Sequence, residues 1–196
     1  MEKEIFMKKL KDKILNEGKV LPGNILKVDN FVNHMIDPEL FMEMGEEFYE
    51  EFKEEKIDKV LTIEVSGIGV AFATAYKFGC PMLFAKKTTS KTIVDDCYIS
   101  QVYSYTKDTT YDIRVIKKYL KEGENVLLVD DFLANGKALE GLIDLCNQAG
   151  VDVKGIGIVI EKAFQEGGKN IRDKGYHVRS LARIKEFKDG KVIFAD

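Results

Sequence analysis

The sequence is poor in the residues that build soft-metal sites. It contains three cysteines, two histidines and no tryptophan in 196 residues. The cysteines (Cys80, Cys97 and Cys146) are far apart and form no CxxC pair, and His34 and His177 are the only histidines that could join them. We therefore expect no structural zinc site, and we interpret the thiols as small buried apolar groups in a reducing compartment. Neither histidine has an evident partner.

The sequence also lacks an excess of positive charge and any long apolar run. Its formal net charge is -3, so recognition of phosphate has to be local and a nucleic-acid partner is not expected. Residues 1–13 contain no apolar core of a secretory signal, and no later run reaches the length of a membrane span. We expect a cytoplasmic protein without a membrane partner.

Apolar periodicity predicts one α/β domain over residues 1–196. Short β-branched runs alternate with helical patterns, which indicates a central parallel sheet with helices on both faces. The expected helices are residues 2–16, 38–54, 67–78 and 137–148, plus a short one after residue 162. The expected strands are residues 60–65, 81–85, 100–105, 111–116, 125–129, 153–160, 177–184 and 192–194. Residues 19–33 are expected to be irregular or edge-like, with a turn at Pro22 and Gly23.

The most informative motif is residues 126–138, VLLVDDFLANGKA. A buried strand ends in Asp130 and Asp131, a loop of small residues follows, and a helix begins. Ligands of open α/β sheets bind at this edge, and free N–H groups at a helix N-terminus form a cradle for phosphate. An aspartate pair after a strand is also an ordinary start of a turn. The loop and helix that follow favour a sugar-phosphate site instead.

This motif resembles the phosphoribosyl pyrophosphate (PRPP) motif of type I phosphoribosyltransferases. The resemblance continues along nearly the whole chain and is strongest to the bacterial branch that acts on xanthine. It rests on separate blocks in the same order: residues 25–34 (ILKVDNFVNH), 62–68 (TIEVSGI), 84–87 (FAKK), 102–106 (VYSYT), 155–162 (GIGIVIEK) and 180–184 (SLARI). It implies transfer of the phosphoribosyl group of PRPP to xanthine, which gives xanthosine 5′-monophosphate and pyrophosphate in purine salvage.

The resemblance also implies roles for individual residues. Asp130 and Asp131 would be catalytic and contact the ribose hydroxyls. Residues 1–36 would contribute to a hood over the purine. The expected PRPP-binding residues are Ser66, Gly67, Lys86, Lys87, Ala134, Asn135, Gly136, Lys137 and Ala138, and the expected base-binding residues are Leu26, Asn33 and Lys162. Many relatives have threonine where Asn135 stands. Mg²⁺ would be held mainly through PRPP, without a direct protein ligand, and the protein would be a homodimer.

Two other functions remain open at this point. The base could be guanine or hypoxanthine, because one exocyclic group separates these purines from xanthine. The chain could also be a PRPP-sensing regulator without catalysis, although its first thirty residues are too short and too weakly basic for an added DNA-binding domain. An RNA-binding side role is harder to exclude.

Residues 86–97 lack apolar periodicity and are rich in lysine and hydroxyl side chains, which predicts an exposed loop. The alternative is a plain solvated connection, whereas the resemblance implies a flap that closes over PRPP. If it is a flap, limited proteolysis within residues 86–97 should slow when PRPP and Mg²⁺ are added, because closure orders the segment. Cleavage at the same rate with and without the ligands would identify a plain connection.

Overall fold

The computed structural model describes residues 2–88, 96–104 and 108–195. The N-terminal elements are α1 (Glu2–Glu17), β1 (Lys19–Leu21), β2 (Ile25–Lys27), the π-helix η1 (Asp29–Asn33) and α2 (Pro38–Phe52). The middle of the chain forms β3 (Lys59–Ile63), α3 (Gly67–Phe78), β4 (Met82–Thr88), β5 (Cys97–Ser104), β6 (Thr109–Ile116) and the 3₁₀ turn η2 (Lys117–Tyr119). The remainder forms β7 (Asn125–Leu133), α4 (Lys137–Ala149), β8 (Asp152–Lys162), α5 (Glu166–Asp173), β9 (Val178–Lys188) and β10 (Lys191–Phe194).

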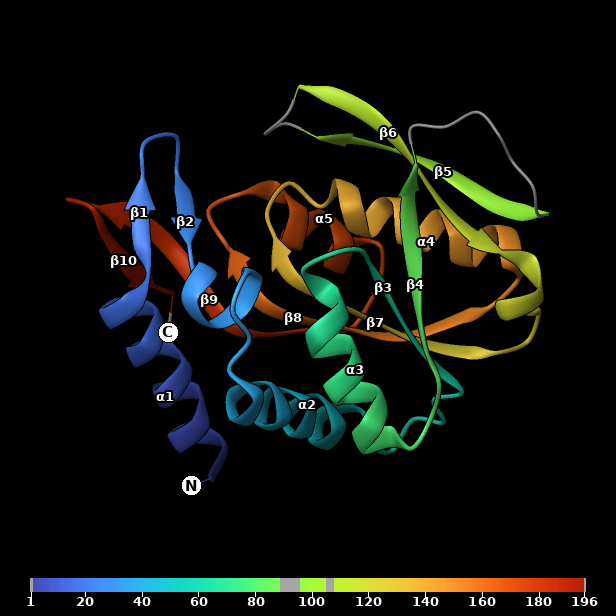
Figure 1. Ribbon diagram of the computed structural model, residues 1–196, viewed down its shortest axis with the longest axis horizontal. Coiled ribbons are helices and arrows are strands. Elements are labelled where there is room, and N and C mark those ends of the chain that lie inside the picture. Colours follow the sequence, from blue (N-terminus) through green and yellow to red (C-terminus); the bar gives the residue numbers. More distant parts are fainter. Residues whose placement is uncertain (1, 89–95, 105–107, 196) are drawn as a thin grey trace.

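The predicted parallel sheet is confirmed. Eight strands pair in the order β10-β9-β8-β7-β3-β4-β6-β5, and every pairing from β9 through β4 is parallel. The strands at both ends pair antiparallel. Figure 1 shows α1, α2 and α3 on one face of the sheet and α4 and α5 on the other. Because parallel strands end at the same edge, the segments that follow β3 and β7 are brought close together.

Two buried apolar clusters hold these layers together. The first joins α1, α2 and α3 to one face of the sheet, and the second joins α4 and Ile171 of α5 to the other face. Helix α2 lies close to β8 because that strand carries two glycines beneath it. A Cβ at Gly157 would come within 2.8 Å of Phe48, and one at Gly155 within 2.3 Å of Phe52. The glycines thus make room for the two aromatic rings of α2.

Local signals define the helix boundaries as predicted. The Asp37 carboxylate accepts a hydrogen bond from the amide of Leu40 at 3.2 Å, and Pro38 occupies the first turn of α2. Helices α3 and α4 end at Gly79 and Gly150, which both have positive φ. No helix of the described segments is long and apolar enough to cross a membrane.

The structure corrects several sequence-based predictions. Residues 19–33 form a short hairpin and a π-helix, because the turn after Leu21 allows β1 and β2 to pair. Strand β7 continues to Leu133 instead of ending before Asp130, since it remains paired with β8. His177 does have partners: its Nε2 lies 3.1 Å from Glu51 Oε1, and its ring packs edge-on against Phe52. These contacts join residues distant in the sequence.

Candidate active site

The aspartate pair lies near the end of β7, where this strand is no longer paired with β3. Pairing between β3 and β7 stops at Leu128, whereas pairing with β8 continues through Leu133. Asp130 is 4% exposed and Asp131 is half-buried. The amide of Asp131 donates a hydrogen bond to Oδ1 of Asp130 at 3.0 Å. The pair therefore lies in a paired strand, at the notch where β3 and β7 separate, rather than in a turn.

Burial raises the pKa values of both carboxyl groups. For Asp130 the rise is large, because desolvation adds to repulsion from Asp131. Desolvation also raises the pKa of Asp131. The positive charge of Lys87 opposes both shifts. A ligand that donates hydrogen bonds or adds positive charge here would stabilise the ionised pair, which suits sugar hydroxyls and a hard cation.

The N-terminus of α3 approaches Asp130 closely, and Gly67 makes this approach possible. A Cβ at Gly67 would stand 2.7 Å from Asp130 Oδ1 and 2.2 Å from Thr62 Oγ1. The preceding residue, Ser66, is half-buried and gives the helix no side-chain cap. The peptide bond between Glu64 and Val65 is cis. The Ile68 amide donates a hydrogen bond to the Val65 carbonyl oxygen at 3.2 Å, and no side chain caps the first turn, whose end therefore suits an anion beside the carboxylate pair.

The predicted phosphate loop, residues 134–138, joins β7 to α4. Asn135 Oδ1 accepts a hydrogen bond from the amide of Lys137 at 3.1 Å, so this side chain shapes the loop from within. Gly136 has φ +84° and lies against Gly167 at the start of α5. A Cβ at Gly167 would come within 2.3 Å of the Ala134 carbonyl oxygen. Ala138 is half-buried in the first turn of α4. The close contact between Gly136 and Gly167 holds the loop against the start of α5.

The ammonium group of Lys137 is already engaged within α4. Its Nζ lies 2.7 Å from Glu140 Oε2, and Glu140 also pairs with Lys174 at 3.0 Å. The contribution of Lys137 to the loop is therefore its amide, which Asn135 orients.

Lys86 and Lys87 lie in β4, not in the loop predicted for residues 86–97. Both pair with β6, which extends the strand to Thr88, and residues 89–95 of the predicted flap fall outside the described segments. Glu64 Oε1 accepts a hydrogen bond from the Lys87 amide at 2.6 Å, which ties β4 to the segment before α3. Both lysine side chains are exposed. Their backbone is therefore fixed while their ammonium groups remain accessible.

Tyr111 is a site residue that the sequence reading missed. Lys87 Nζ lies 5.3 Å from the centre of its ring, and burial together with the charge of Asp130 raises the pKa of its hydroxyl. Tyr111 belongs to β6 and reaches the notch only through the antiparallel pairing of β4 with β6. No local motif marks it, because that pairing depends on residues far away in the chain.

The predicted base-binding residues come from the N-terminal segment and the end of β8. Lys162 Nζ donates a hydrogen bond to the Asn24 carbonyl oxygen at 2.9 Å, and burial lowers the pKa of this lysine. Leu26 is 6% exposed and packs in the core, whereas Asn33, at the end of η1, is exposed. The structure thus joins Lys162 to the hairpin that carries Leu26, and Asn33 follows this hairpin at the end of η1.

A model of the phosphoribosyl transferase domain matches residues 32–190. The chain belongs to the phosphoribosyltransferase family. It is 61% identical to a xanthine phosphoribosyltransferase of Finegoldia magna over 97% of this chain and 100% of that protein. It is 53% identical to a xanthine phosphoribosyltransferase of Bacillus cytotoxicus over 96% and 95% of the two chains. The predicted resemblance is confirmed.

Solved structures of phosphoribosyltransferases share the fold. The adenine phosphoribosyltransferase of Rhodothermus marinus superposes with a TM-score of 0.76 at 23% identity, over 92% of this chain and 99% of that one. The enzyme of Saccharomyces cerevisiae, crystallised with adenine, gives 0.73 at 21% identity over 91% and 99% of the two chains. At these identities the likeness shows the arrangement of strands and helices, and the base has to be inferred from other observations.

We expect Asp130→Asn to lower turnover by about ten- to a hundredfold, the value of a charge-assisted hydrogen bond. The raised pKa means that ionised Asp130 destabilises the fold as pH rises above the pKa of the unfolded chain. The variant should therefore melt at or above the wild-type temperature at pH 7.5, and this difference should shrink toward pH 4. Turnover and calorimetric melting measured together test both effects. A parallel loss of activity and melting temperature would show a structural role.

Proposed function

We propose that this phosphoribosyltransferase transfers the phosphoribosyl group of PRPP to xanthine and releases pyrophosphate. The observation that carries the proposal is the meeting of Asp130 and Asp131 with the N-termini of α3 and α4 at one notch of the sheet. This arrangement suits a sugar with phosphates at both ends. The choice of xanthine is supported by the names of the 53–61% identical relatives.

Each end of PRPP has a matching part of the site. Asp130 and Asp131 accept hydrogen bonds from the ribose hydroxyls. The amides of residues 134–138 hold the 5′-phosphate, and the uncapped start of α3, with Ser66 and Gly67, holds the pyrophosphate. Lys86 and Lys87 add positive charge on that side as the leaving group separates. The separation of the two amide cradles by the carboxylate pair matches the order of groups along PRPP.

Catalysis in this site is electrostatic. A purine ring nitrogen attacks C1 of the ribose, the bond from C1 to the pyrophosphate oxygen breaks, and the sugar develops oxocarbenium character. The buried carboxylates stabilise positive charge on the sugar, and the lysines stabilise negative charge on the leaving group. Because these groups are fixed before the reaction, little reorganisation is needed.

Mg²⁺ fits this site as part of the substrate complex. The described segments contain no group of three histidine, cysteine, aspartate or glutamate residues arranged to hold a metal ion. The aspartates instead offer oxygen atoms next to the proposed PRPP site, and Mg²⁺ prefers phosphates, carboxylates and retained water. When bound, it neutralises charge on the leaving pyrophosphate. Asp130 and Asp131 would also orient the ribose.

The purine is proposed to lie under residues 1–36, between Leu26, Asn33 and Lys162. The support is the hydrogen bond of Lys162 to the Asn24 carbonyl, which brings the end of β8 against the N-terminal hairpin. A carbonyl oxygen of a purine can replace the Asn24 carbonyl oxygen as the acceptor of this hydrogen bond. Lys162 would then donate to the oxygen at purine C6, while Asn33 addresses the C2 side.

Turnover with PRPP, Mg²⁺ and each of four purines tests the function. Xanthine should be preferred, and guanine and hypoxanthine should follow. Adenine should be rejected, because it presents an amino group to the Lys162 ammonium. Equal use of adenine and xanthine would contradict the base assignment. PRPP binding without turnover of any purine would identify a PRPP-sensing regulator instead.

The two base contacts predict different changes. Lys162→Ala should lower kcat/KM for xanthine by about ten- to a hundredfold and leave PRPP affinity nearly unchanged. Asn33→Ala should narrow the preference for xanthine over hypoxanthine, because hypoxanthine has no C2 oxygen. Lys185→Ala, an exposed lysine of β9, is the matched control. If Lys162→Ala leaves the ratio of kcat/KM for oxopurines to kcat/KM for adenine unchanged, the base pocket lies elsewhere.

We also propose that the enzyme is a cytoplasmic homodimer. Supporting this, large apolar side chains are exposed along α3 and just before it: Phe72 is 60% exposed, Tyr76 68% and Val65 72%. Ile36 lies next to them, since its Cδ1 is 3.1 Å from the point where a Gly69 Cβ would stand. A patch of this kind is typical of a protein interface. A second copy of the chain would cover it beside the pyrophosphate site.

Sedimentation velocity should find a dimer at micromolar concentration. Phe72→Glu should shift the protein to monomer, because it places a charge within the apolar patch. Tyr119→Glu, which changes a 49% exposed aromatic residue outside the patch, should remain dimeric. A wild-type monomer would remove the homodimer, and a dimer in both variants would place the interface on another surface.

A further inference from the structure

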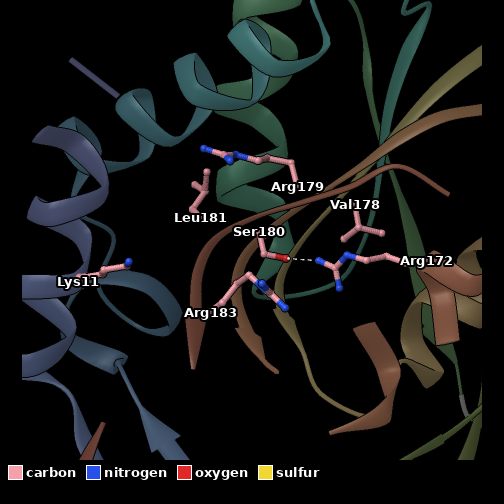
Figure 2. Close-up of a pocket in the computed structure, with 7 residues that line it drawn as sticks. All are labelled: Lys11, Arg172, Val178, Arg179, Ser180, Leu181 and Arg183. Atoms are coloured by element: carbon pink, nitrogen blue, oxygen red, sulfur yellow. Dashed lines mark hydrogen bonds between the residues drawn. The ribbon is translucent and has the colours of Figure 1, made fainter. Parts of the chain in front are cut away.

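A buried ion pair joins the end of β8 to α5, outside the notch. Glu161 is 2% exposed, and each of its carboxylate oxygens accepts a hydrogen bond of 2.8 Å from Arg172 of α5. The hydroxyl of Ser180 in β9 donates a further hydrogen bond to Glu161 at 2.5 Å, and Arg183 Nε lies 3.3 Å from the same carboxylate. Figure 2 shows Arg172 approaching Ser180, to which it also donates a hydrogen bond at 3.4 Å. One carboxylate is therefore held by α5 and by β9.

This carboxylate is ionised despite its burial. Burial by itself raises the pKa of Glu161, but the hydrogen bonds from Arg172 and Ser180 outweigh it, so that the pKa is lowered. A well-packed apolar pair often stabilises a fold as much as a buried ion pair does. What the ion pair adds is geometry, because a guanidinium fork that binds both oxygens of a carboxylate fixes one orientation.

Helix α5 is short enough to need such a contact. It has eight residues, and a helix of this length is not stable by itself. Ile171 supplies its large buried apolar side chain, and Arg172 lies in its last turn. The first turn packs on the same carboxylate through Gly168, where a Cβ would stand 2.7 Å from Arg172 Nη1 and still closer to Glu161 Oε1. Glu161 thus fixes both ends of α5.

The start of α5 in turn contacts the phosphate loop. A Cβ at Gly136 would stand 3.1 Å from the Cα of Gly167, and a Cβ at Gly167 would stand 2.5 Å from the amide nitrogen of Gly136. At this separation the backbones of the loop and the helix are in direct contact. A small shift of α5 would therefore change the position of the loop amides.

We infer that Glu161 and Arg172 are positioning residues for the 5′-phosphate: their ion pair holds α5, and α5 holds residues 134–138 in the conformation that binds phosphate. The inference rests on the proposed function in one respect, the assignment of the 5′-phosphate to this loop. The proposed pyrophosphate site lies at the start of α3, a helix on the other face of the sheet (Figure 1). Its affinity should not depend on the ion pair.

Calorimetric titration of the full chain with ribose 5-phosphate and, separately, with pyrophosphate and Mg²⁺ tests the inference. Arg172→Gln should weaken binding of ribose 5-phosphate by about tenfold and change that of pyrophosphate by less than about twofold. A general loss of stability would weaken both ligands. Arg172→Lys keeps the charge, so it should fold where Arg172→Gln does not. It cannot bind both oxygens in the same way, and it should weaken ribose 5-phosphate by a smaller factor.

The matched control is Arg183→Gln, which removes a guanidinium group from the same carboxylate but from β9 instead of α5. The two side chains are similarly exposed, 32% for Arg172 and 41% for Arg183. Arg183→Gln should lower the melting temperature and bind ribose 5-phosphate as the wild type does.

Three results would overturn the inference. Wild-type affinity for ribose 5-phosphate in both Arg172 variants would leave the proposed function intact and remove the role of the ion pair. Equal weakening by Arg172→Gln and Arg183→Gln would show that the charge balance around Glu161 matters, and not the position of α5. A wild-type protein that binds pyrophosphate but no ribose 5-phosphate would refute the assignment of the loop as well.

Discussion

The burial of the Asp130 carboxylate is the constraint on which the rest of the candidate site depends. A carboxylate with little access to water is costly, and its raised pKa expresses that cost. The fold places it where β3 no longer pairs with β7, while the pairing of β7 with β8 continues. The positive side chain of Lys87 and the start of α3 lie around it. Each favours the ionised form of the carboxylate, which would accept hydrogen bonds from the proposed ribose.

Glycines let these parts approach one another. Gly67 allows α3 to come against Asp130, and the contact of Gly136 with Gly167 places the phosphate loop against α5. Any side chain at Gly67 or Gly167 would overlap atoms less than 3 Å away. The anion cradles are therefore built from close backbone contacts. Side chains such as Asn135 refine their shape.

The sequence predicted the parts of the site that are local. The strand, loop and helix over residues 126–138 could be recognised because buried strand, paired carboxylates and small-residue loop are adjacent in the chain. The role of Tyr111 could not be recognised in this way, nor could the hydrogen bond from the Lys87 amide to Glu64. Both depend on the pairing of β4 with other strands. Lys87 was predicted to lie in a loop for the same reason. Strand β4 continues past its expected end because it pairs there with β6, which is distant in the sequence. The N-terminal hairpin was missed because its strands are only three residues long.

The contact between Lys162 and the N-terminal hairpin bears on how a purine preference could diverge among relatives. The acceptor is the main-chain carbonyl of Asn24, a residue with φ +59°, so the position of the ammonium group follows the shape of a turn rather than the chemistry of a side chain. Replacement of the Asn24 side chain by another that tolerates this conformation keeps the acceptor in place. Insertion or deletion of one residue in the turn moves it. With Lys162 as the proposed base contact, a change in turn length would alter purine selectivity without a substitution of the lysine itself.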